Sequence, residues 1–160
     1  MSDSPCDPVF AFVPFLILVE EMKALEAKNT SDFLATAEEA VRAGGAVLRE
    51  MFGRAKVREK GPADLVTEAD FASQETVRGI VLGAFPDHGF LGEEDHPTAC
   101  NVTGPSSYRW ILDPLDGTTN FVHGVPHFCV SLALETEGFL VVGAVYNPMV
   151  EECYLAEAGN

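Results

Sequence analysis

The chain has 160 residues, 47% of them hydrophobic and 22% charged, which is the composition of a globular domain rather than of a disordered segment. This length suffices for one domain with a real core and is short for two. The formal net charge of −15 argues against a nucleic-acid partner, because such binding depends on neutralising phosphates with lysine and arginine.

Residues 1–30 are predicted to form an extension of unknown role before the domain proper, residues 31–160. Residues 9–19 are an apolar run of eleven residues broken by Pro14, too short for a membrane-spanning helix of about 20 residues. The residues before this run carry acids and no positive charge, which argues against a secretory signal. A docking segment, a family-specific extension and a wrongly assigned start codon all fit, and we favour the last two.

The first helix of the domain is predicted to begin at Ser31, which is a suitable N-terminal cap. It should end near Phe52-Gly53, where glycine tolerates a left-handed conformation. Apolar residues recur at steps of four and three and predict one buried face. This face consists of Phe33, Ala37, Val41, Gly44, Leu48 and Met51.

A basic link over residues 56–62 leads to the second predicted helix. Thr67, followed three residues later by Asp70, resembles a capping box with aspartate in place of glutamate. The helix should run from about Glu68 to Phe85, where Pro86-Asp87 stops it. Its predicted buried face consists of Val77, Ile80, Val81 and Ala84.

The remainder of the chain is predicted to be mainly strands. A hairpin turn is expected at Thr136-Glu137-Gly138, between two β-branched and aromatic runs. The order of two helices followed by strands favours an α+β fold, a layered sandwich with two helices packed on an antiparallel sheet. The predicted strands are residues 89–92, 108–112, 128–135, 139–146 and 151–156, with a loop over residues 96–107.

Residues 110–123, WILDPLDGTTNFVH, are the most informative stretch of the chain. Two carboxylates, Asp113 and Asp116, are expected in a turn after an apolar run, and carboxylate oxygens are the ligands that Mg²⁺ prefers. Backbone N–H groups and threonine hydroxyls beside them suit a phosphate oxygen. The stretch therefore predicts metal-assisted attack on a phosphate ester.

Further acids stand at the ends of predicted elements, where they can converge on one crevice. Asp70 lies in the first turn of the second helix, and Glu93-Glu94 follow a short strand. Each group also has an ordinary interpretation: a helix N-terminal acid for Asp70, a solvated turn for Glu93-Glu94, and a simple turn at Asp113. The chain lacks the Asp-x-Asp-Gly-Thr, phosphate-loop and nucleophile-elbow motifs of other phosphate and ester hydrolases.

Three blocks resemble the inositol monophosphatase family of Mg²⁺-dependent, lithium-sensitive phosphatases. They are KGPADLVTEAD at residues 60–70, GFLGEE at 89–94 and WILDPLDGTTNFVHGVPHFCVSLAL at 110–134. The resemblance begins at about Phe33 and implies a cytoplasmic phosphoric monoester hydrolase whose substrate is a small phosphorylated polyol or sugar. It also implies Mg²⁺ as cofactor and a possible homodimer, while the net charge and the short apolar run predict neither a nucleic-acid nor a membrane partner.

The same resemblance implies a role for each matching residue. The implied ligands of a first metal ion are Glu93, Asp113 and the Leu115 carbonyl, and Asp113 and Asp116 are the implied ligands of a second. The attacking water is activated by Glu93 with Thr118, while Asp70 and Glu94 support the site and Lys60 lies near its mouth. No phospho-enzyme is expected. The phosphate and substrate contacts come from Gly117, Thr118, Thr119, Asp116 and Glu93.

Inositol monophosphate is the expected substrate, because TTNFVHG resembles the inositol monophosphatase branch. Histidinol-phosphate, fructose-bisphosphate and nucleotide phosphatases of the same superfamily remain alternatives. A downstream Trp-Asp-x-Ala-Ala-Gly block of the family, whose aspartate completes the second metal site, has no counterpart before Asn160. We therefore expect an N-terminal fragment with poor stability in isolation, and an inactive metal-binding fragment is a further alternative.

Overall fold

The computed structural model describes residues 15–54, 57–61, 64–95 and 106–159, and the side chains of residues 15–29 and 57–66 lie outside this description. Three earlier predictions therefore fall wholly or partly outside the described residues. They concern most of the loop over residues 96–107, part of the apolar run over residues 9–19, and the side chain of Lys60. The elements are α1 (Phe15–Met51), β1 (Val57–Gly61), β2 (Asp64–Thr67), α2 (Glu68–Ala84), β3 (Gly89–Gly92), β4 (Tyr108–Asp116), α3 (Thr118–Val122), β5 (Cys129–Thr136), β6 (Phe139–Asn147) and β7 (Glu152–Glu157).

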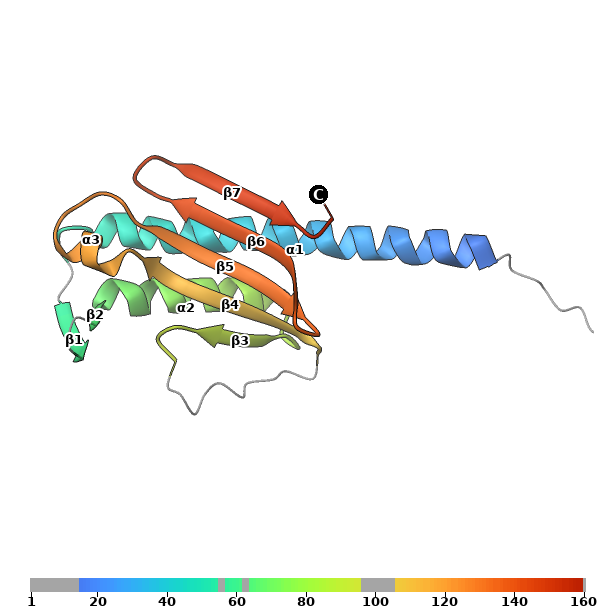
Figure 1. Ribbon diagram of the computed structural model, residues 1–160, viewed down its shortest axis with the longest axis horizontal. Helices are drawn as coiled ribbons and strands as arrows, with labels where there is room; N and C mark the ends of the chain where they lie inside the picture. Colours follow the sequence, from blue (N-terminus) through green and yellow to red (C-terminus); the bar gives the residue numbers. More distant parts are fainter. Residues whose placement is uncertain (1–14, 55–56, 62–63, 96–105, 160) are drawn as a thin grey trace, which may run out of the picture.

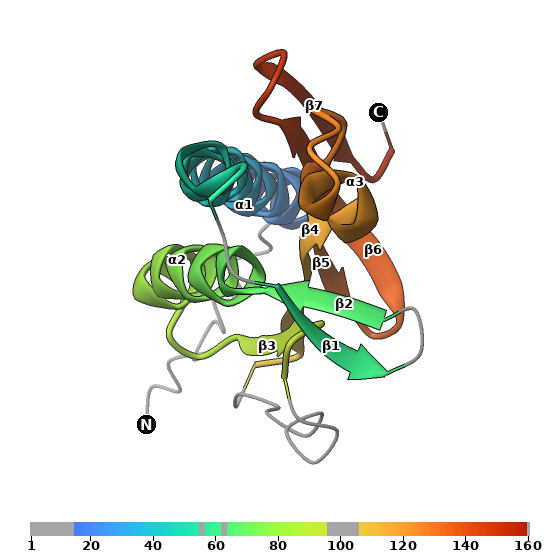
Figure 2. The ribbon, with the colours of Figure 1, turned by 90° about the vertical axis from the view of Figure 1, so that its left-hand side faces the viewer.

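The fold has two layers, with α1 and α2 packed side by side on one face of a five-stranded sheet (Figures 1 and 2). The strand order is β3-β4-β5-β6-β7, and α1 lies over β5, β6 and β7 while α2 lies over β3 and β4. Every neighbouring pair is antiparallel except β3 and β4, which are parallel. The predicted α+β architecture is confirmed, with a sheet that is mostly antiparallel.

The first helix is longer than predicted, because α1 begins at Phe15 and continues without a break through residue 30. The proposed cap at Ser31 is therefore wrong. Residues 16–28 are mainly leucine, glutamate, lysine, alanine and methionine, which are strong helix formers, and no glycine or proline interrupts them. The predicted buried face is confirmed from Phe33 to Leu48, and Gly53 follows the helix in the left-handed region at φ 73°. No described helix, α1 included, combines the length and apolarity needed to cross a membrane.

The start of α2 agrees closely with the prediction. Thr67 is the N-cap, its hydroxyl accepts a hydrogen bond from the N–H of Ala69, and Asp70 completes the capping box. Val77 and Val81 are buried as predicted, but Ala84 is exposed because the helix ends there, next to solvent. The basic link contains strand β1, which pairs antiparallel with β2 directly before the helix, and neither strand was predicted.

The core between the layers is centred on Trp110, whose side chain is completely buried in β4. Phe33 from α1 meets this indole edge-on, with ring centroids 6.5 Å apart. Phe85 and His88 follow α2 and lie 6.1 and 6.2 Å from the same ring. One aromatic cluster thus connects both helices to the strand that continues into the acidic motif.

Burial of His88 makes the stability of the domain depend on pH. Its ring stacks on Phe85 and Tyr108, and burial lowers its pKa below 6.5, while Asp87 raises it by a smaller amount. Because the folded-state pKa is below the unfolded value, protonation favours unfolding. We expect the free energy of unfolding to fall as the pH drops below about 6.5. Urea titrations at pH 7.5 and 5.0 measure this loss.

A His88→Phe variant keeps the aromatic packing and removes the titrating group, so it is the control for that experiment. The loss between pH 7.5 and 5.0 should be smaller in the variant than in the wild type. Equal losses would assign the acid sensitivity to the carboxylates and not to His88.

Candidate active site

The two aspartates of the central motif lie in strand β4 and not in a turn after it. The strand continues to Asp116, with a register shift against β5 between Asp113 and Asp116. Such a bulge bends a strand and re-aims its side chains. Asp113 pairs with Ser131 and Asp116 with Cys129, so both carboxylates remain attached to the sheet. The expected simple turn is wrong, because pairing with β5 outweighs the turn preference of Asp113-Pro114.

Asp113 is a half-buried carboxyl surrounded by other acids. Burial is the largest cause that raises its pKa above 3.8, and the negative charges of Asp116 and Asp70 raise it further. Hydrogen bonds with the Glu93 side chain and with the N–H of Leu115, at 3.1 Å from Oδ1, act in the opposite direction. Four carboxyl groups from three separate parts of the chain thus influence one another at the end of β4.

Glu93 is brought to Asp113 by the parallel pairing of β3 with β4. Gly92 pairs with Leu112, and the N–H of Glu93 donates to the Leu112 carbonyl oxygen at 3.1 Å. Two carboxyl groups can share a hydrogen bond only when one of them carries a proton. A divalent cation can take the place of that proton, so the contact between Glu93 and Asp113 fits a cation site by its chemistry.

Asp70 connects the start of α2 to the acidic motif. Its side chain is only 2% exposed, and Oδ2 accepts from the Thr67 N–H at 2.9 Å and from the Thr67 hydroxyl at 2.6 Å. Its Oδ1 lies 3.5 Å from the hydroxyl oxygen of Thr118, which is also 3.0 Å from the Leu115 carbonyl oxygen. The helix-capping interpretation of Asp70 is therefore correct, and the same side chain also reaches the motif.

Gly117 turns the chain from β4 into the short helix α3, which was not predicted. Its φ of 96° lies in the left-handed region, and a Cβ there would lie 3.1 Å from the His127 carbonyl oxygen. Glycine is therefore required both by conformation and by space. Thr118 and Thr119 form the first turn of α3 directly after Gly117, with Thr119 exposed.

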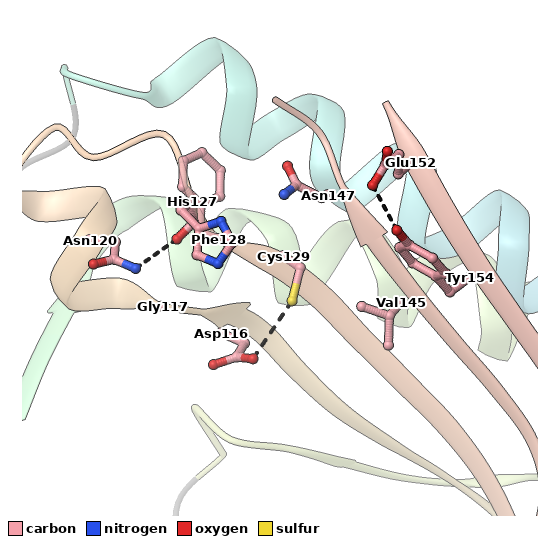
Figure 3. Close-up of a pocket in the computed structure, with 10 residues that line it drawn as sticks. All are labelled: Asp116, Gly117, Asn120, His127, Phe128, Cys129, Val145, Asn147, Glu152 and Tyr154. Carbon is pink, nitrogen blue, oxygen red and sulfur yellow. Dashed lines mark hydrogen bonds between the residues drawn. The ribbon is translucent and has the colours of Figure 1, made fainter. Parts of the chain in front are cut away.

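A cavity of about 390 Å³ opens beside Asp116, Gly117 and Cys129 (Figure 3). Burial, with a smaller effect of the Asp116 charge, raises the pKa of the Cys129 thiol to about 11. The protonated thiol donates to Oδ2 of Asp116 at 3.7 Å. The Cys129 side chain is half-buried at the site. The hairpin register that places it opposite Asp116 could not be read from the motif alone.

Sequence reasoning also missed the polar residues that support the site from a distance. Asn120 donates to the His127 carbonyl oxygen at 2.8 Å and holds the loop after α3. Gln74 bonds to Glu94 and Asp95 in the turn that carries Glu93, and Asp95 accepts from the N–H of Gly92. Among the described residues, no three His, Cys, Asp or Glu side chains are grouped closely enough to hold a metal ion. The acids at β4 are therefore neighbours, and their arrangement is not that of a closed coordination shell.

The sequence has extensive similarity to known proteins. A model of the inositol monophosphatase family matches residues 29–160. Inositol-1-monophosphatase from Rhizobium meliloti (strain 1021) is 44% identical over 126 residues, which are 76% of this chain and 46% of that protein. Fructose-1,6-bisphosphatase/inositol-1-monophosphatase from Aquifex aeolicus (strain VF5) is 41% identical over 135 residues, 82% of this chain and 50% of that protein.

Solved structures share the fold. The extragenic suppressor protein suhB from Bartonella henselae aligns with a TM-score of 0.75 and 39% identity, over 81% of this chain and 50% of that one. The IMPase from Thermotoga maritima aligns with a TM-score of 0.72 and 35% identity, over 81% and 49%. The chain spans about half the length of the curated relatives it matches. Since a family model matches most of its residues and its fold agrees, the chain belongs to the inositol monophosphatase family.

Proposed function

We propose that this chain provides the acidic centre of a Mg²⁺-dependent phosphatase that hydrolyses inositol monophosphate to inositol and phosphate. The observation that carries the proposal is the environment of Asp113, where burial and the charges of Asp116 and Asp70 raise the carboxyl pKa. Acids held together in this way are disfavoured in the absence of a compensating cation. They stand directly before a left-handed glycine and threonines that suit a phosphate.

The donor set fits Mg²⁺, because it consists of hard oxygen atoms. We propose that Glu93, Asp113 and the Leu115 carbonyl hold one Mg²⁺ and that Asp113 and Asp116 hold a second. A bound Mg²⁺ would supply Lewis-acid polarisation of a phosphoryl oxygen and neutralise developing negative charge. The contact of Glu93 with Asp113 and the half-buried position of Asp113 support this assignment, since both keep carboxylate oxygens at one place.

The protein groups around the acids suit the orientation of a water molecule. We propose that the carboxylate of Glu93 accepts a proton from the attacking water and that the Thr118 hydroxyl orients that water. The position of Thr118 Oγ1, 3.0 Å from the Leu115 carbonyl oxygen and 3.5 Å from Oδ1 of Asp70, supports this role. Asp70 then acts by holding Thr118 and by capping α2, consistent with its burial.

The phosphate group is proposed to lie against Gly117, Thr118 and Thr119. The first-turn N–H groups of a helix have no carbonyl partner within the helix and favour anions. The left-handed φ of Gly117 places this turn immediately after Asp116. The cavity of about 390 Å³ beside Asp116 offers space for the polyol part of the substrate. A cytoplasmic location and a homodimer belong to the same proposal.

The proposed function predicts release of phosphate from inositol 1-phosphate that requires Mg²⁺. Removal of Mg²⁺ by EDTA should reduce the rate of phosphate release about 10²-fold or more, since Lewis-acid stabilisation of the transition state contributes several kcal/mol. A phosphate-release assay with inositol 1-phosphate, histidinol phosphate, fructose 1,6-bisphosphate and a nucleotide bisphosphate measures both activity and preference. Hydrolysis of only another substrate would assign the same chemistry to a different substrate class.

A second candidate is a metal- or phosphate-binding protein without catalytic activity. The acids around Asp113 would serve this candidate equally well, because their chemistry fits a cation whether or not a phosphate ester is hydrolysed. Calorimetric Mg²⁺ binding without phosphate release from any of the four substrates would support this second candidate over the first.

A further inference from the structure

The turn that carries Glu93 is closed by its own hydrogen bonds. The N–H of Asp95 donates to the Gly92 carbonyl oxygen at 3.1 Å, and the N–H of Gly92 donates to Oδ2 of Asp95 at 2.9 Å. Asp95 therefore bonds to both backbone groups of Gly92. This arrangement brackets Glu93 and Glu94 between two fixed residues.

A buried glutamine of α2 holds the same turn from outside. The side chain of Gln74 is only 3% exposed. Its Oε1 accepts from the N–H of Glu94 at 3.1 Å, and its Nε2 donates to Oδ1 of Asp95 at 3.0 Å. These two bonds require an acceptor and a donor on one planar group, which is the property of an amide and not of a carboxylate.

The fit between Gln74 and the turn leaves no room for another side chain at Gly92. A Cβ on Gly92 would lie 2.1 Å from Oε1 of Gln74 and 2.4 Å from its Cδ. The amide therefore occupies the space where a side chain of residue 92 would otherwise be. The absence of a side chain at this position allows the close contact between helix and turn.

The charge of Asp95 is balanced by Arg78, one helical turn after Gln74. Arg78 forms an ion pair with Oδ1 of Asp95, and its guanidinium lies over the Phe90 ring at 4.5 Å from the centroid. The side chains of Arg78 and Asp95 are 28% and 12% exposed, so the pair is largely shielded from water. Asp95 is thus occupied within the protein, whereas Glu93 points to Asp113.

We infer that Gln74 is a positioning residue that fixes the direction of Glu93 toward Asp113, an inference that rests on the proposed function. Gln74 holds both neighbours of Glu93 in the chain. It accepts a hydrogen bond from the N–H of Glu94 and packs against Gly92. The N–H of Glu93 is bound to Leu112 of β4, so the main chain of Glu93 is restrained from two sides. Loss of the amide would release one side of this restraint and widen the range of Glu93 orientations.

The test compares two variants of the full chain with a matched control. Gln74→Met keeps the size of the side chain and removes both hydrogen bonds. Gln74→Glu keeps an acceptor for the Glu94 N–H but places a carboxylate against Asp95. The control, Val81→Ala, removes a fully buried side chain two turns later in the same helix and destabilises α2 without touching the turn.

Gln74→Met should lower kcat about 10- to 100-fold and change KM less than twofold, as expected when support for a reacting group is lost. Gln74→Glu should lower kcat to a similar extent, because the donor to Asp95 is lost. Amide hydrogen exchange at Glu94, measured by NMR, should become faster in Gln74→Met. Val81→Ala should lower the melting temperature and leave kcat and exchange at Glu94 close to wild type.

The inference would be overturned if kcat fell in both Gln74→Met and Val81→Ala and if each fall matched the loss of melting temperature in that variant. A titration with Mn²⁺, followed by electron paramagnetic resonance, separates this failure from failure of the proposed function. A wild type that binds Mn²⁺ but hydrolyses no phosphate ester contradicts the function alone. In that case weaker Mn²⁺ binding in Gln74→Met, but not in Val81→Ala, supports positioning, and equal binding overturns it.

Discussion

Asp113→Asn is expected to abolish phosphate hydrolysis and, at the same time, to stabilise the metal-free protein. The substitution keeps the shape of the side chain and replaces a carboxylate oxygen by an amide nitrogen, which does not bind Mg²⁺. Since Lewis-acid stabilisation contributes several kcal/mol and about 1.4 kcal/mol corresponds to a tenfold change, the rate should fall about 10³-fold. Phosphate release from inositol 1-phosphate at saturating Mg²⁺ measures this loss.

The gain in stability follows from the pKa of Asp113. Burial and the charges of Asp116 and Asp70 raise this pKa above 3.8, so the ionised carboxylate is less favourable in the folded than in the unfolded chain. At neutral pH that penalty is present, and it disappears as the pH falls and the group is protonated. Asparagine is neutral at every pH and removes the penalty. The melting temperature without Mg²⁺ should therefore rise in the variant, while the gain on adding Mg²⁺ should be lost.

Asp95→Asn is the matched control, because it makes the same chemical change in an acid two residues after Glu93. Asp95 forms an ion pair with Arg78 and accepts a hydrogen bond from the N–H of Gly92. Its replacement should lower the melting temperature, the opposite sign to Asp113→Asn. Turnover by Asp113→Asn at the wild-type rate would contradict the assignment of Asp113 as a metal ligand.

Features of the fold that depend on near neighbours in the sequence were predictable. The capping box at Thr67 and Asp70 is set by three consecutive peptide units, and the structure has both of its hydrogen bonds. The hairpin turn is equally local, since Glu137 and Gly138 adopt φ of 52° and 82°, as a tight two-residue turn requires. Burial on α1 followed from helical periodicity and needed no knowledge of the partner strands.

Features that depend on distant residues were not predictable. Pairing with β5 keeps Asp113 and Asp116 in strand geometry, although Asp, Pro and Gly in that stretch favour a turn. The hydrogen bonds of Gln74 join an α2 side chain to a turn 20 residues later, and polarity alone gave no sign of its burial. The candidate site residues could be named from the chemistry of the motif and its family resemblance, whereas the groups that orient them act through the fold.

Trp110→Ala is expected to have the largest effect on stability of any single change in the core. The indole is completely buried in β4 and lies beside Phe33 and Phe85, so its removal opens a cavity between both helices and the sheet. Truncation of a buried aromatic side chain costs about 3–5 kcal/mol. Domains are stabilised by about 5–15 kcal/mol in total, so the variant should be partly unfolded near 37 °C. Urea unfolding followed by circular dichroism measures the change.

Phe139→Ala provides the comparison, since this aromatic residue begins β6 and is 73% exposed. Its truncation should change the free energy of unfolding by no more than about 0.5 kcal/mol. Trp110→Phe should fall between the two, because it keeps much of the ring and removes an indole Nε1 that is buried without a hydrogen-bond partner among the described residues. Equal midpoints for Trp110→Ala and Phe139→Ala would show that the cluster contributes little.

The same strand carries Trp110 in the core and Asp113 at the site, so both substitutions should reduce phosphate release, but for different reasons. Trp110→Ala acts by lowering the population of folded protein, and its activity should recover when the temperature is lowered or Mg²⁺ is raised, since ligands stabilise the folded state. Asp113→Asn should not recover on cooling, because it is already folded and its folded state lacks a ligand oxygen. Recovery on cooling in both variants would place the role of Asp113 in folding and not in metal binding.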